Sequence, residues 1–313
     1  MSLASTMLRA SFALSDKKRD RGLTVPDGVL RSLDIPYGTD SKQQLLDVYR
    51  PRREDGRDSA LPVIVSVHGG GWVYGDKELY QYYCMDLALR GFAVVNFSYR
   101  LAPETKFPAQ LEDTNAVFHW VLDHAAEYGF DTEHIFAVGD SAGGHLLGLF
   151  CDLCVNPAYA DRFEFKPPVG FVPRAVALNC GAFHIEAGNP RDLTTQLMRD
   201  LLPASGRYAD LSLVQVVEHV APGFPPSYLM TSTGDFLIDQ PKLLMKAFER
   251  CGVPYTYKLF GNEKEKKAYG HVFHLNIKSD KAKTVNDTEA VFFKNHMGKS
   301  HDGERKNACR AAL

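Results

Sequence analysis

The stretch Ala137-Val138-Gly139-Asp140-Ser141-Ala142-Gly143-Gly144 decides how the rest of the chain is organised. The apolar residues 135–138 predict a short buried strand, and residues 145–150 predict a helix. A strand that turns sharply into a helix at Ser141 places that hydroxyl outside regular structure, and the flanking glycines permit the tight backbone. The G-x-S-x-G spacing is therefore typical of a nucleophile elbow, although a plain Ser-Gly turn has the same pattern.

Length and charge set the broad class of protein. The chain has 313 residues, enough for one large α/β domain spanning 1–313 with a substantial core. Charged residues make up 24% and the formal net charge is −2, so there is no overall basic field to attract nucleic acid or an anionic membrane. Neither partner is favoured by composition.

The amino-terminal segment does not have the pattern of a secretion signal. Its apolar residues are interrupted by Arg9, and the basic cluster Lys17-Lys18-Arg19 follows them, whereas a signal peptide has its charge first and then a longer apolar run. We expect a cytoplasmic protein. No run of about 18 apolar residues predicts a spanning helix.

Six cysteines are scattered along the chain, which is more typical of buried free thiols than of a disulfide scaffold. Cys151 and Cys154 form a C-x-x-C, but no second pair and no histidines at ligand spacing accompany them. We therefore expect core packing and no metal site.

The order of apolar segments predicts the architecture. Segments 32–37 and 45–49 flank a polar turn, as in an antiparallel hairpin. From Pro62 onward, short apolar runs alternate with helical segments, which indicates a mostly parallel sheet covered on both faces. We place the strands at 63–67, 92–97, 135–138, 175–179, 227–231 and 255–260.

Two segments are expected to form a small cap. Leu3, Met7, Ala10 and Leu14 fall at helical spacing within residues 1–25, which predicts a helix laid over an apolar surface, with a frayed tail as the alternative. Residues 183–223 interrupt the strand alternation and are expected to form a lid. The polar tail 299–313 is expected to be disordered.

A glycine-rich loop follows the first long apolar strand, with the sequence His68-Gly69-Gly70-Gly71-Trp72. Three successive glycines let backbone N–H groups approach a substrate closely, as stabilisation of an oxyanion requires. A phosphate-binding loop is the competing interpretation, but neither a closing Lys-Ser or Lys-Thr nor a G-x-G-x-x-G spacing is present.

A serine nucleophile needs a base, and the base needs an acid. Asp235 directly follows the segment 227–231, and its rival Asp239 more naturally caps the next helix. His271 lies in the loop beyond the last strand, with His274 as the rival base. The resulting order Ser, Asp, His is that of α/β-hydrolases.

These motifs together resemble the hormone-sensitive-lipase-like group of α/β-hydrolase esterases over about residues 34–293. The segments that carry the resemblance are 68–72, Tyr-Arg-Leu-Ala-Pro-Glu at 99–104, 139–144, the acid motif at Asp235 and Gly-His-Val-Phe at 270–273. One departure is Phe236, where members of the group often have proline.

The resemblance implies roles for individual residues. Ser141 corresponds to the nucleophile, Asp235 to the acid and His271 to the base. The N–H groups of Gly70, Gly71 and Ala142 correspond to the oxyanion hole, and His68 would brace the glycine loop.

The expected activity is that of a serine carboxylic-ester hydrolase acting through an acyl-enzyme, without a metal or cofactor. Short-chain acyl, acetylated-sugar and aryl esters are all candidate substrates, and a homodimer is compatible with the sequence. An amide hydrolase of the peptidase or arylformamidase kind, and a non-catalytic receptor on the same fold, are the alternatives. A cluster of aromatic residues after the glycine loop is expected either to line a pocket or to pack in the core: Trp72, Tyr74, Tyr80, Tyr82 and Tyr83.

Overall fold

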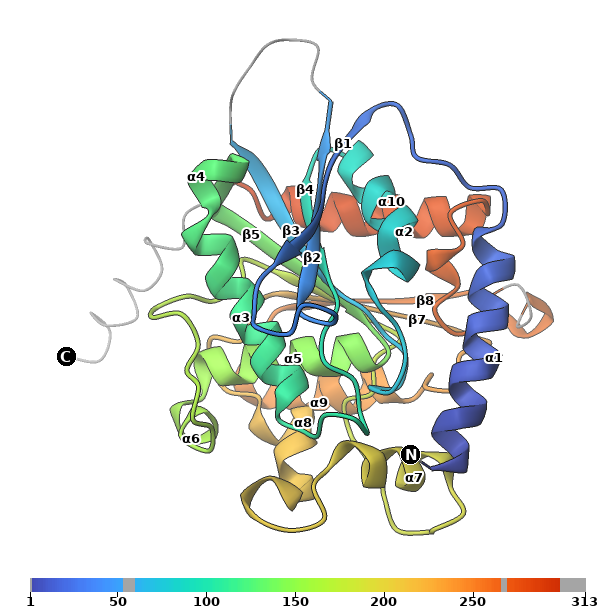
Figure 1. Ribbon diagram of the computed structural model, residues 1–313, viewed down its shortest axis with the longest axis vertical. Coiled ribbons are helices and arrows are strands. Elements are labelled where there is room, and N and C mark those ends of the chain that lie inside the picture. The colour runs from blue at the N-terminus through green and yellow to red at the C-terminus, as the bar shows by residue number, and fades with distance from the viewer. Residues whose placement is uncertain (1, 53–59, 266–268, 299–313) are drawn as a thin grey trace.

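An eight-stranded sheet forms the centre of the molecule (Figure 1). The computed structural model describes residues 2–52, 60–265 and 269–298, so the tail 299–313 lies outside the described residues. The strand order is β1-β2-β4-β3-β5-β6-β7-β8. The strands span Val29–Pro36 (β1), Leu45–Pro51 (β2), Leu61–Val67 (β3), Ala93–Phe97 (β4), Phe130–Asp140 (β5), Val176–Asn179 (β6), Ser227–Ser232 (β7) and Tyr255–Phe260 (β8).

The direction of the strands confirms the predicted fold class. β1 and β2 form the expected antiparallel hairpin, and β2 also runs antiparallel to β4. The pairs from β4 through β3 to β8 are all parallel. The sheet is therefore mostly parallel, with an antiparallel hairpin at one edge.

Helices cover both faces of this sheet. Alternate residues of β3 show why: Val63 and Val65 belong to one buried cluster, and Ile64 belongs to the other. The first cluster includes residues of α3, α5, α8 and α9, and the second includes residues of α2 and α10. The helices after α1 span Lys77–Leu89 (α2), Ala109–Asp123 (α3), Ala125–Tyr128 (α4), Ala142–Val155 (α5), Pro157–Ala160 (α6), Leu193–Leu201 (α7), Val216–His219 (α8), Gln240–Cys251 (α9) and Asp280–Asn295 (α10).

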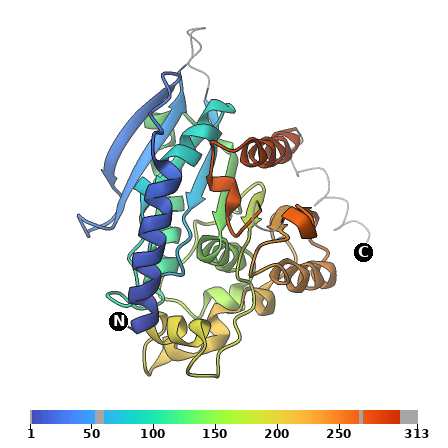
Figure 2. The same cartoon turned by 90° about the vertical axis from the view of Figure 1, so that its right-hand side faces the viewer.

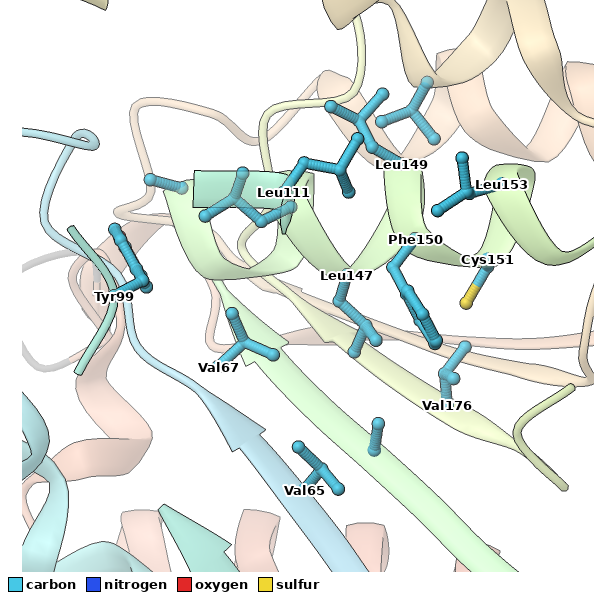
Figure 3. Close-up of a cluster of buried hydrophobic side chains, with 14 of the residues drawn as sticks. Val65, Val67, Tyr99, Leu111, Leu147, Leu149, Phe150, Cys151, Leu153 and Val176 are labelled. Atoms are coloured by element: carbon cyan, nitrogen blue, oxygen red, sulfur yellow. The ribbon is translucent and has the colours of Figure 1, made fainter. Parts of the chain in front are cut away.

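Helix α5 is the most deeply buried helix around the predicted elbow. Figure 3 shows Leu147 and Phe150 pointing from α5 toward the sheet, where Val67 and Val176 lie. The ring of Phe150 also stacks on Phe118 of α3, with 4.0 Å between centroids. Cys151, on the same helix, is a buried free thiol, as core packing predicts.

Helix α1 (Leu3–Asp20) stands along one side of the molecule, with its first turns beside α7 (Figures 1 and 2). The helix forms, but the prediction of its packed face is wrong. Leu3, Met7 and Leu14 are 74%, 64% and 73% exposed, and Ala10 is exposed as well. Periodicity showed that these residues share a face and could not show whether that face points inward.

Polar contacts explain the orientation of α1. The backbone N–H of Ser2 and the hydroxyl of Ser5 donate to Asp200 of α7. Arg9 donates to the carbonyls of Val73 and Ala102 at 2.6 and 2.8 Å, and it forms an ion pair with Glu104. These contacts, together with Leu8 packed on the core and the Phe12 ring against Tyr74, hold the inner side of α1 against the body and leave the predicted stripe outside. Among the described residues, no helix is both long and apolar enough to cross a bilayer.

The turn between β5 and α5 has the strained geometry that its sequence predicts. Ser141 has φ 53° and ψ −119°, in the region that favours glycine. Its N–H donates to the carbonyl of Asn179 at 3.0 Å. A Cβ on Gly143 would overlap the backbone carbonyl of Val67, so the close approach of α5 to β3 requires glycine there.

Substituting Gly143→Ala should therefore lower the free energy of unfolding by roughly 1–3 kcal/mol, because the added methyl group meets a backbone atom that cannot rotate away. Chemical denaturation followed by circular dichroism measures the change. Gly188→Ala is the matched control, since a Cβ at Gly188 meets nothing within 4 Å. Equal stability of the two variants would contradict the packing argument.

Candidate active site

One cavity brings together residues that are far apart in the sequence. Its volume is about 200 Å³, and Ser141, His271, Gly69 and Gly70 are among the residues that line it. Ser141 follows β5, the glycines follow β3, and His271 lies in the loop beyond β8. All three segments begin at the carboxyl edge of the parallel sheet, where ligands of open α/β sheets bind.

Asp235 lies behind His271 and is held by several donors. His271 Nδ1–H donates to Asp235 Oδ1 at 2.7 Å. Thr231 Oγ1 donates to Oδ2 at 2.9 Å, and the backbone N–H of Leu237 donates to Oδ1 at 2.8 Å. Burial alone would raise the pKa of Asp235, but the contact with His271 and the other donors hold that pKa below its usual value. The carboxylate therefore stays ionised and holds His271 through Nδ1. The second ring nitrogen, Nε2, is left to accept a proton.

The rival residues lie elsewhere. His274 is fully buried, neither of its ring nitrogens has a hydrogen-bond partner among the described residues, and burial lowers its pKa to about 3. Asp239 occupies the N-cap position of α9, as expected, but its side chain pairs with Lys242 at 2.8 Å instead of accepting a capping hydrogen bond. Neither residue is among those lining the cavity.

The glycine loop is braced from behind by His68. The ring of His68 stacks on Tyr99 with 4.0 Å between centroids, and its Nδ1–H donates to the carbonyl of Gly69 at 2.7 Å. Gly70 has φ 115°, and a Cβ there would overlap the carbonyl of Tyr74. Gly71 has φ 62° and adjoins Leu8 and Leu197. The loop therefore needs glycine for its conformation as well as for access.

Ala142 is the first residue of α5. The first N–H groups of a helix have no partner within the helix, and the helix dipole gives them partial positive charge. Ala142 is buried directly beside Ser141. Its N–H thus belongs to a helix end that suits a developing negative charge.

Comparison with known proteins agrees with this geometry. A family model described as BD-FAE matches residues 46–157. The carboxylesterase NlhH of Mycobacterium tuberculosis is 38% identical over 256 residues, which cover 76% of each chain. The chain belongs to the hormone-sensitive-lipase-like family of α/β-hydrolase esterases.

Other relatives of this esterase-family chain differ in length or identity. Tuliposide A-converting enzyme 1 of Tulipa gesneriana is 28% identical over 267 residues, covering 79% of this chain and 65% of the tulip protein. The chain therefore spans slightly less than two thirds of that relative. An inhibited esterase B from Lactobacillus rhamnosis superimposes with a TM-score of 0.84 at 28% identity, covering 95% of this chain and 97% of the other.

The aromatic residues after the glycine loop of this family member separate into two groups. Tyr74 and Tyr80 line the cavity. Trp72 is buried and donates to His145 Nδ1 at 3.1 Å, while Tyr83 donates to buried Glu289 at 2.6 Å. Tyr82 reaches the carbonyl of Leu23. Tyr74 and Tyr80 therefore meet the expectation of pocket lining, and Trp72 and Tyr83 meet that of core packing.

Tyr80 links the glycine loop to the nucleophile elbow, a connection that the sequence did not reveal. Its hydroxyl donates to Asp140 Oδ2 at 2.7 Å and accepts from the N–H of Gly69 at 2.8 Å. Burial raises the pKa of Asp140 to about 7, while the Tyr80 hydrogen bond opposes that rise. One buried hydroxyl therefore sets the distance between the loop and the residue before Ser141.

Helix α1, which was expected to form part of a cap, supplies one wall of the cavity, but through residues other than the apolar stripe on which that expectation rested. Phe12, Ser15, Asp16 and Arg19 are among the lining residues. Asp16 accepts from Tyr74 Oη at 3.0 Å and from Arg19 at 2.9 Å. No local pattern marks the contact between Asp16 and Tyr74, because these residues are 58 positions apart.

Phe236 is a further lining residue. It is 70% exposed, and its ring lies 4.2 Å from that of His271. The departure from proline at this position was visible in the sequence, but its consequence for the cavity was not. The residues predicted as a lid, 183–223, are not among those lining the cavity, and their role as a lid stays a prediction.

Two other features do not compete with this cavity. Cys180 lies with Asp235 and His271 at a spacing that could hold a metal ion, but His271 and Asp235 already bond to each other, and a structural zinc site needs four ligands. A hollow of about 500 Å³ beside α3 is larger, but Ser141, Asp235 and His271 are absent from the residues that line it.

Substituting Tyr80→Phe should lower kcat about 10- to 100-fold and leave KM nearly unchanged, because Gly69 and Asp140 lose their shared partner and the loop donors shift. Steady-state kinetics on p-nitrophenyl acetate measure both constants. Tyr82→Phe, which loses a hydroxyl bonded away from the cavity, is the matched control. If the two variants have the same kcat, Tyr80 does not position the loop.

Proposed function

We propose that this protein is a serine carboxylic-ester hydrolase that acts through an acyl-enzyme on esters of short-chain acids. The observation that carries the proposal is that Ser141 and His271 line the same cavity, with Asp235 hydrogen-bonded behind the histidine. The homologous carboxylesterase and the family assignment support the same chemistry.

In the first step, Ser141 Oγ attacks the ester carbonyl carbon while His271 Nε2 takes the hydroxyl proton. Asp235 stays ionised and stabilises the imidazolium that forms. The carbonyl oxygen becomes an oxyanion, which the N–H groups of Gly70, Gly71 and Ala142 bind. The alcohol then leaves with the proton from His271, so the acyl group remains on the serine.

The second step reverses these roles with water. His271 takes a proton from water, the hydroxide attacks the acyl carbon, and the same three N–H groups bind the second oxyanion. Collapse of this intermediate releases the acid and returns the proton to Ser141. Each step exchanges one C–O bond for another and no atom changes its oxidation state, so the chemistry needs no redox partner.

The size of the cavity favours small acyl groups. Its volume of about 200 Å³ lies below the roughly 300–1,000 Å³ of typical ligand pockets. Esterase B, the structural relative, was crystallised with a C4-C4 tributyrin phosphonate. Small acyl groups are therefore favoured over long chains, and sugar acetates and small aryl esters fit the same limit.

Substituting Ser141→Ala should reduce turnover of p-nitrophenyl acetate by at least about 10³-fold, because no other group can form the acyl-enzyme. Circular dichroism checks that the fold is intact. Ser15→Ala is the matched control, since Ser15 lines the same cavity on α1 and should keep turnover within a few-fold. Substantial turnover by the Ser141 variant would refute the assignment, and a higher rate on an anilide than on the matching ester would make the protein an amide hydrolase.

A series of p-nitrophenyl esters from acetate to decanoate tests the acyl preference. We expect kcat/KM to be highest between two and six carbons and at least about tenfold lower at ten carbons, because each methylene that the pocket cannot hold is worth about 1–3 kcal/mol. A rate that keeps rising to decanoate would show that the acyl group does not stay within this cavity.

A further inference from the structure

The outer side of α1 carries an apolar stripe that is largely exposed to solvent. We use the name outer stripe for Leu3, Met7, Ala10 and Leu14, which recur at i, i+4, i+7 and i+11 and so lie on one face of the helix. The three large members are each at least 64% exposed. Exposed leucines are common singly, but three aligned on one helix form a continuous surface.

The opposite side of α1 is fixed to the body. Arg9 reaches two backbone carbonyls, Ser5 contacts Asp200, and Arg19 donates to the carbonyl of Leu79 at 2.7 Å. Turning the outer stripe inward would break all of these contacts and move Arg9 and Arg19 away from their partners into solvent. The helix is therefore held with its stripe facing outward.

A cluster of basic residues lies at the end of the stripe. Lys17, Lys18 and Arg21 are exposed, and Lys278 joins them by donating to the carbonyl of Arg21 at 3.2 Å. We call these four residues the basic cluster. The two acids of α1, Asp16 and Asp20, both pair with Arg19, and residues 16–21 keep a net charge of +2, since four cations stand against two acids. Cations near a helix C-terminus complement its dipole, but that effect does not account for the apolar stripe beside them.

We propose that α1 docks on an anionic lipid surface, with the outer stripe entering the headgroup boundary and the basic cluster contacting the headgroups. An apolar face flanked by lysines is the arrangement with which helices lie in a membrane interface. The net charge of −2 does not oppose this docking, because the attraction acts locally, within about a Debye length.

A second copy of the chain fits the same surface poorly. Helix α1 has 18 residues, so it is about 27 Å long and its outer face covers roughly 300 Å². A stable dimer buries about 800 Å² on each partner. Pairing two such faces would also leave the lysines without acids opposite them, since the acids of α1 are tied to Arg19.

Docking would place the cavity close to the lipid. Phe12 and Arg19 line the cavity from the inner side of α1, so only about one helix diameter, roughly 10 Å, separates it from the outer stripe. An ester leaving the lipid surface would then have a short path to Ser141. This consequence rests on the proposed esterase function, whereas the docking itself does not.

Cosedimentation with vesicles tests the docking independently of catalysis. The Ser141→Ala protein is mixed with phosphatidylcholine vesicles that contain either no anionic lipid or about 30 mol% phosphatidylglycerol. Each lysine near an anionic surface strengthens binding about fivefold. We expect binding to the anionic vesicles only, weakened by high salt. Lys17→Gln with Lys18→Gln should weaken it about 30-fold. Met7→Gln with Leu14→Gln should weaken it at least about tenfold.

The controls make each outcome decisive. Leu33→Gln with Val169→Gln removes two exposed apolar side chains on other elements and should bind as strongly as the parent protein. Absence of binding to anionic vesicles, equal binding to neutral ones, or an equal loss in this control would overturn the proposal. So would a dimer in sedimentation velocity that only the Met7 and Leu14 variant abolishes. The same substitutions are also made in the protein that retains Ser141. Its turnover of p-nitrophenyl acetate tests the esterase function separately from docking.

Discussion

The backbone of Ser141 is the constraint on which the site depends. A residue other than glycine adopts φ 53° only when its surroundings hold it there, and such strain costs on the order of 1–3 kcal/mol. The hydrogen bond to Asn179 and the close contact of α5 with β3 provide that support. This conformation places Ser141 between the end of β5 and the start of α5, where backbone N–H donors and the loop that carries His271 can both reach it.

Behind the elbow lies a layer of buried polar groups that rigidifies this arrangement. Glu289 of α10 accepts from Tyr83 Oη and from Asn179 Nδ2, each at 2.6 Å. Burial raises the pKa of Glu289 to about 7, as it does for Asp140. Buried hydrogen bonds of this kind restrict the geometry, because a shifted partner leaves a costly unpaired group. Asn179 takes part in both contacts: its backbone carbonyl accepts from the Ser141 N–H, and its side-chain amide donates to Glu289.

The sequence predicted the parts of the molecule that local chemistry encodes. The strands, the elbow, and the residues that lie at strand ends follow from apolar periodicity and glycine spacing, so Ser141, Asp235 and His271 could be named before their meeting was visible. His274 was harder to separate from His271, because burial depends on the packing of α2 and α10 and not on neighbouring letters. The orientation of α1 was predicted wrongly since Arg9 and Ser5 find their partners about 60 to 200 positions away. The role of the Tyr80 hydroxyl was not predicted for a similar reason: it bonds to both Gly69 and Asp140, which are far apart in the sequence and adjoin only in the folded chain.

Because α1 forms one wall of the cavity, substitutions that change the shape of the cavity can be distinct from substitutions that change the reacting groups. The reacting groups come from the carboxyl edge of the sheet. The lining residues Phe12, Ser15, Asp16 and Arg19 come from one helix, which a few polar contacts and the packing of Leu8 attach to the body. Substitutions in that helix can reshape the space around the substrate without moving the strained serine or its partners. The chain can thus diversify what it admits through its first twenty residues while the strands beneath keep the same chemistry.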